Sequence, residues 1–158
     1  MGKKETATEG IEQVYRELDQ ALDSFTEQEL LKPSSNPGWS AQDTLAHLTT
    51  IEERTRGQIN VCLTGGDWNP AEDIDTYNER QVAARRGQSV KQLRDELTKQ
   101  HQETLALLRG AQETDFDKEY THPRRGRITL GRRDFGLLTA PHKPRHDHRR
   151  QNTDDDDD

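Results

Sequence analysis

Apolar residues recur every three or four positions along three long segments of the chain, which is the spacing of an amphipathic helix. The segments cover residues 8–24, 41–63 and 90–109. Their apolar positions are Ile11, Val14, Leu18, Ala21, Leu22 and Phe25 in the first, Leu45, Leu48 and Ile51 in the second, and Val90, Leu93, Leu97, Leu105 and Leu108 in the third. The pattern predicts three helices that bury one face each against a common core.

Two shorter apolar patterns predict additional helices. One covers about 73–85, and a fourth main helix begins at Thr129 with Leu130, Phe135, Leu137 and Leu138 toward the core. Residues 110–128, between the segment 90–109 and this fourth main helix, form a long connection anchored by Phe116 and Tyr120. Because no long alternating pattern of a strand appears, the predicted class is all-α, a four-helix bundle with a short extra helix between the second and third main helices.

Helix starts are marked by side chains that can cap the first turn. Ser40 is followed three residues later by Asp43, and the same spacing joins Thr26 to Glu29 and Ser89 to Gln92. A hydroxyl at the first position and a carboxylate or amide at the fourth satisfy two backbone N–H groups that have no partner in the helix. These pairs predict helix starts after residues 26, 40 and 89, and Gly65-Gly66 ends the second main helix.

Composition narrows the class of function. The chain has 158 residues, 28% of them hydrophobic, and a net charge of −7, which argues against a general nucleic-acid binder. Residues 124–150 are locally basic, either as a solvated end of the chain or as an anion-binding rim. No signal peptide or membrane span is visible, so we expect a cytoplasmic protein. The predicted organisation is a flexible N-terminus at 1–7, a helical bundle at 8–140 and an irregular charged tail at 141–158.

Histidines supply the candidate chemistry. His47 lies close to the apolar face of the second main helix, and His142 and His146 are four residues apart, which puts both on one face of a helix. Three histidines with an open fourth position are a common set of metal ligands. His101 is expected at the surface. Cys62, the single cysteine, is interpreted as a small buried residue rather than a nucleophile.

The segment Gly38-Trp39-Ser40-Ala41-Gln42-Asp43-Thr44-Leu45-Ala46-His47-Leu48 resembles the start of the second helix in the DinB-like (DinB/YfiT) four-helix bundles. Residues 75–82 and 89–93 are also similar, and the resemblance covers roughly residues 8–135. It implies an up-down-down-up or a related bundle topology and a divalent metal, Zn²⁺ or Ni²⁺, bound by His47, His142 and His146. It further implies thiol-dependent transferase or hydrolase-like chemistry on a small molecule, with a low-molecular-weight thiol as cofactor. Independently of the resemblance, Asp43 and Glu52 are the two candidates for a carboxylate that orients a histidine, and the sequence assigns neither.

Two prolines oppose a regular helix at the metal-ligand pair. Pro141 precedes His142, and Pro144 lies between His142 and His146, where a proline removes a helical hydrogen bond and costs about 3 kcal/mol or more. The alternative function is therefore a metal-free bundle that works by binding or protection, in the form of a homodimer, without membrane or nucleic-acid partners. Metal content separates the two hypotheses.

Overall fold

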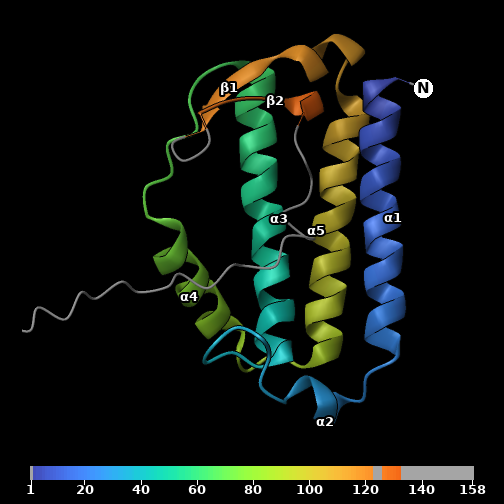
Figure 1. Cartoon of the computed structure of the whole chain (residues 1–158), viewed down its shortest axis with the longest axis vertical. Coiled ribbons are helices and arrows are strands. Elements are labelled where there is room, and N and C mark those ends of the chain that lie inside the picture. Colours follow the sequence, from blue (N-terminus) through green and yellow to red (C-terminus); the bar gives the residue numbers. More distant parts are fainter. Residues whose placement is uncertain (1, 123–125, 133–158) are drawn as a thin grey trace, which may run out of the picture.

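The computed structural model describes residues 2–122 and 126–132. Three long helices lie side by side: α1 (Lys3–Asp23), α3 (Ala41–Thr64) and α5 (Val90–Gly110). Figure 1 shows α3 and α5 running in the same direction and α1 in the opposite one. The short helix α2 (Glu27–Leu30) closes one end, and α4 (Ile74–Arg85) packs beside α3. The four helices of twelve or more residues confirm the predicted all-α class.

The helix starts agree with the capping pairs in the sequence. Thr26, Ser40 and Ser89 each accept a hydrogen bond from a backbone N–H, and Glu29, Asp43 and Gln92 return the bond to the capping residue. Asp73 caps α4 in a similar way. Helix α1 begins at Lys3, five residues earlier than predicted. Its first turn is held by the Lys4 ammonium, which donates to the carbonyl of Ala111 at 2.9 Å after the end of α5.

The segment after α5 differs from the prediction. A 3-10 helix, η1 (Glu113–Asp117), leads into an antiparallel hairpin of β1 (Glu119–His122) and β2 (Gly126–Thr129), followed by the 3-10 turn η2 (Leu130–Arg132). The fourth main helix therefore does not begin at Thr129, which pairs with Glu119 instead. Gly126 has a φ of 72°, a conformation that favours glycine and turns the chain into β2. Positions 133–158, including the predicted tail at 141–158, lie outside the described residues.

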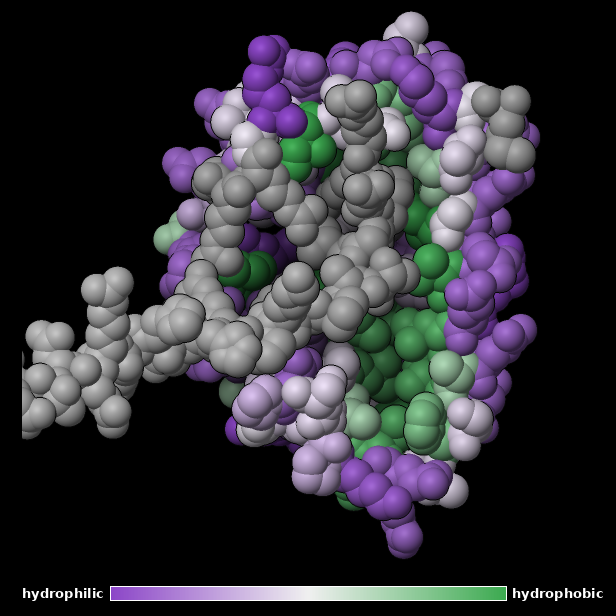
Figure 2. Space-filling view, in the orientation of Figure 1, coloured by the Kyte–Doolittle hydropathy of each residue, from purple (hydrophilic) through white to green (hydrophobic). Residues whose placement is uncertain are grey.

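The core lies between α1, α3 and α5 and extends under η1 and the hairpin. Phe116 and Tyr120 are buried as predicted, and Leu130 is buried with them. The apolar stripe of α1 is only partly confirmed, because Leu22 is buried but Phe25 is 53% exposed. Figure 2 shows apolar side chains gathered in the lower half of one face, bordered by hydrophilic side chains. Within residues 2–122 and 126–132, no helix combines the length and hydropathy that a membrane span requires.

Candidate functional site

His47 lies in the second turn of α3, on a helix whose start is fixed by side chains. Ser40 and Asp43 form the complete capping box, and Gln42 donates to the backbone carbonyl of Gln88 at 2.7 Å. The imidazole is half-buried, and its centroid lies 5.1 Å from the Trp39 ring at a tilt of 59°. The residue is thus held on a rigid element and partly shielded from water by an aromatic ring.

The other two predicted ligands, His142 and His146, lie outside the described residues. Among the residues that the structure does describe, no three His, Cys, Asp or Glu side chains come together as a metal-binding group. The predicted ligand set thus combines His47 with two histidines whose positions the structure does not describe.

The two carboxylates expected near the histidine are engaged elsewhere. Asp43 serves the capping box and forms an ion pair with Arg86 at 3.4 Å. Glu52 points into the bundle, where it is 5% exposed and accepts hydrogen bonds from the hydroxyls of Tyr15 and Thr104. Asp43 thus stabilises the start of α3, and Glu52 joins three helices inside the bundle.

Tyr15, Glu52 and Thr104 form a buried polar cluster that joins α1, α3 and α5. Burial raises the pKa of the Tyr15 phenol, and the neighbouring Glu52 carboxylate raises it further. The Tyr15 phenol therefore remains protonated, and it donates to the Glu52 side chain together with the Thr104 hydroxyl, which gives a buried polar group the partners that it needs. The sequence offers no local signal for this cluster, because its members are 37 and 52 residues apart.

His101 belongs to the same interior, so its predicted surface position was wrong. It is 9% exposed, and its ring stacks on Tyr15 with centroids 3.4 Å apart. Burial lowers the pKa of His101 to about 4, so the imidazole is neutral at pH 7. Its Nδ1 has no hydrogen-bond partner among the described residues. His101 lies on the face of α5 that meets α1, where the Tyr15 ring covers the imidazole and keeps it from solvent.

Cys62 is buried as predicted, and its thiol donates to the backbone carbonyl of Lys118 at 3.2 Å. This contact connects the end of α3 to the residue between η1 and β1. The interpretation of Cys62 as a small packed residue is confirmed.

Comparisons with known proteins agree with this architecture. The family model of the DinB superfamily matches residues 11–148, a range that includes His47, His142 and His146. Among solved structures, the chain is similar to YfiT from Bacillus subtilis, described as a probable metal-dependent hydrolase with an unusual four-helix bundle topology. The TM-score is 0.66 at 22% identity, over 82% of this chain and 74% of YfiT. The comparison with curated proteins finds no match. Because the family match spans most of its length, the chain belongs to the DinB superfamily.

Proposed function

We propose that this protein is a metal-dependent enzyme that acts on a small molecule, with Zn²⁺ or Ni²⁺ bound by His47, His142 and His146. The observation that carries the proposal is the position of His47. A half-buried imidazole on a well-capped helix, beside an aromatic ring, has the fixed orientation that a metal ligand needs. The family match extends across both other histidines, and YfiT is described as a probable metal-dependent hydrolase.

The donor set suits such an ion. Three neutral imidazoles are a ligand set that leaves a fourth position open for water or substrate. Because the ligands carry no charge, the bound ion keeps its double positive charge and can polarise a carbonyl or lower the pKa of a bound water or thiol. In this arrangement α3 fixes one imidazole, and Trp39 limits the access of water to it.

The reaction class follows from what occupies the open position. A bound water gives hydrolase-like chemistry, and a low-molecular-weight thiol gives a thiol-dependent transferase. The basic residues between 124 and 150 favour an acidic thiol, because arginines bind carboxylates through paired hydrogen bonds. Consumption of the thiol during turnover separates the transferase from the hydrolase.

Elemental analysis of the untagged protein tests the proposal. Because the three proposed ligands of one chain surround a single ion, we expect about one transition-metal ion per chain. We expect His47→Ala to lose that metal. His122→Ala, which removes a hairpin histidine outside the proposed ligand set, is the matched control and retains the metal. Absence of metal after loading with Zn²⁺ or Ni²⁺ would overturn the proposal and favour the metal-free binding protein, whose oligomeric state would then be measured.

A further inference from the structure

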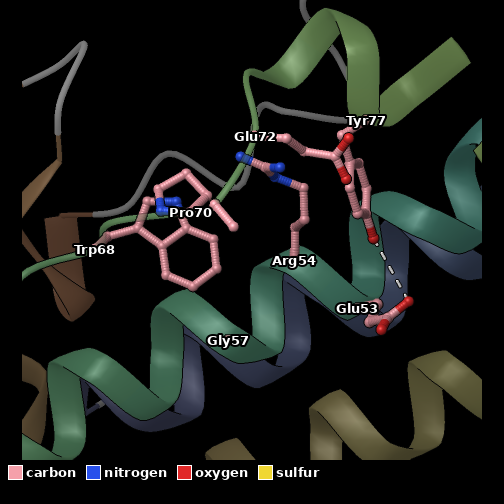
Figure 3. Close-up of a pocket in the computed structure, with 8 residues that line it drawn as sticks. Glu53, Arg54, Gly57, Trp68, Pro70, Glu72 and Tyr77 are labelled. Carbon is pink, nitrogen blue, oxygen red and sulfur yellow. Dashed lines mark hydrogen bonds between the residues drawn. The ribbon is translucent and has the colours of Figure 1, made fainter. Parts of the chain in front are cut away.

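A pocket of about 360 Å³ lies between the middle of α3 and the segment that joins α3 to α4. Figure 3 shows Trp68 and Pro70 on one side, Tyr77 on the other and Arg54 rising between them from α3. The walls are mainly apolar, with two carboxylates, Glu53 and Glu72, among the lining residues. Its size suits a small organic molecule.

The two aromatic rings already hold a cation. The Arg54 guanidinium lies 4.7 Å from the Tyr77 centroid and 5.7 Å from that of Trp68. Arg80 also lies over the Tyr77 ring, at 5.6 Å. These distances fall within the range of attractive cation–π contacts, which occur about once per 70–80 residues in proteins. The three contacts, made by two arginines, show that these ring faces accept guanidinium groups.

The charges around the pocket favour the same class of ligand. Residues 67–79 contain five acidic side chains and no Lys, Arg or His. Glu72 pairs with Arg80, and the Tyr77 hydroxyl lies 3.5 Å from the Glu53 carboxylate. The charged residues that line the pocket are Glu53, Arg54 and Glu72, so once the Arg54 guanidinium moves aside the two carboxylates favour a cation over a carboxylate or a phosphate.

Gly57 makes room for the aromatic wall. A Cβ at this position would lie 2.8 Å from two carbons of the Trp68 ring, closer than real Cβ contacts allow. The indole therefore rests directly on the backbone of α3. The pocket depends on this close approach, since any side chain at residue 57 would push the ring outward.

We propose that this pocket binds a small organic cation, an alkylammonium or guanidinium group, between Trp68 and Tyr77, in the place that the Arg54 guanidinium occupies. Arg54 then acts as an internal competitor that leaves when the ligand enters. The carboxylates of Glu53 and Glu72 balance the charge of the ligand. The proposal does not depend on a metal at His47, so the two can fail separately.

Titration with tetramethylammonium chloride and methylguanidinium chloride, at ionic strength matched with NaCl, tests the proposal. Trp39→Phe leaves Trp68 as the only tryptophan, so its fluorescence reports occupancy of the pocket, and calorimetry gives the affinity. We expect saturable binding to the protein with its native Arg54. Arg54→Ala removes the competitor and increases affinity by about tenfold, or 1.4 kcal/mol.

Matched variants distinguish binding by the aromatic pocket from a general effect of charge. Tyr77→Leu and Glu72→Gln are each expected to weaken binding at least about fivefold, whereas Tyr77→Phe keeps the ring and retains binding. Thermal melts verify that each variant is folded. The proposal is overturned if the protein with Arg54 shows no saturable binding, if Tyr77→Leu binds as well as Tyr77→Phe, or if benzoate binds in place of the cations.

Discussion

Glu52 and Arg54 are two residues apart on α3 and face opposite environments. Two positions on an α-helix differ by about 200°, so one side chain enters the bundle and the other faces the segment before α4. Glu52 is sealed between hydroxyls from α1 and α5, whereas Arg54 lies against two aromatic rings at the edge of an open pocket. Charge buried inside the bundle joins helices, whereas the charge of Arg54 on the outer face contacts the aromatic rings that line the pocket.

The comparison extends to the histidines. His101 belongs to the sealed interior through its stack on Tyr15. His47 is seven residues before Arg54, and that separation places both on nearly the same face of α3. The outer face of this helix therefore carries both proposed sites, about 10 Å apart along its axis at 1.5 Å per residue. Changes on the two faces should have different consequences for stability and for binding.

The largest expected effect comes from Glu52→Ala. It leaves the Tyr15 and Thr104 hydroxyls buried without their acceptor and opens a cavity, so the free energy of unfolding should fall by about 3 kcal/mol. The neighbouring Glu53→Ala removes an exposed carboxylate and should change it by less than about 0.5 kcal/mol. Urea denaturation measures both, and equal effects would mean that the two faces do not differ.

His101 should make the interior sensitive to acid. Burial holds its folded pKa near 4, below the ordinary value of about 6.5. Between these values the unfolded chain takes up a proton that the folded chain does not, so this contribution is fully present above pH 6.5 and is lost as the pH falls toward 4. We expect about 2 kcal/mol less stability across this range. His101→Gln should flatten the slope of stability against pH; an unchanged slope would contradict the assignment to His101.

Two glycine substitutions should act in opposite directions. Gly57→Ala places a Cβ against the Trp68 ring, and overpacking should outweigh the better helix propensity, for a net loss of about 1 kcal/mol and a shift in Trp68 emission. Gly10→Ala, in α1 with open space around it, should stabilise the protein by about 1 kcal/mol. Thermal unfolding measures both changes, and stabilisation by Gly57→Ala would show that Trp68 does not rest on α3.

A small effect on stability is expected for Arg80→Ala. The Arg80 side chain is 57% exposed, and its partner Glu72 is 31% exposed, so solvent weakens the ion pair and its loss should leave the denaturation midpoint nearly unchanged. Chemical denaturation combined with cation titration would show whether this residue affects stability more than binding. If Arg80→Ala lowered the free energy of unfolding as much as Glu52→Ala does, the charges on the outer face would serve stability, which would contradict the account.

Local signals predicted the helices well because their causes are local. Capping pairs at Thr26, Ser40 and Ser89 lie within four residues, and the apolar spacing has the helical period. The hairpin was missed because its strands have only four residues each, too few for a clear alternation. The surface position predicted for His101 was wrong, and the buried contacts of Glu52 were not predicted, because the partners of both residues come from other helices. A glycine inside α3 and the acidic, aromatic segment 67–79 were the available signals for the pocket.

Zn²⁺ titration of the metal-stripped protein, together with urea denaturation, tests most directly whether the outer face of α3 serves binding and its inner face serves stability. The variants are His47→Ala on the outer face and Glu52→Gln on the inner one. We predict that His47→Ala loses metal affinity at least about a hundredfold (about 2.7 kcal/mol) while remaining folded, and that Glu52→Gln binds metal normally but unfolds at lower urea. Normal metal binding by His47→Ala would contradict the account.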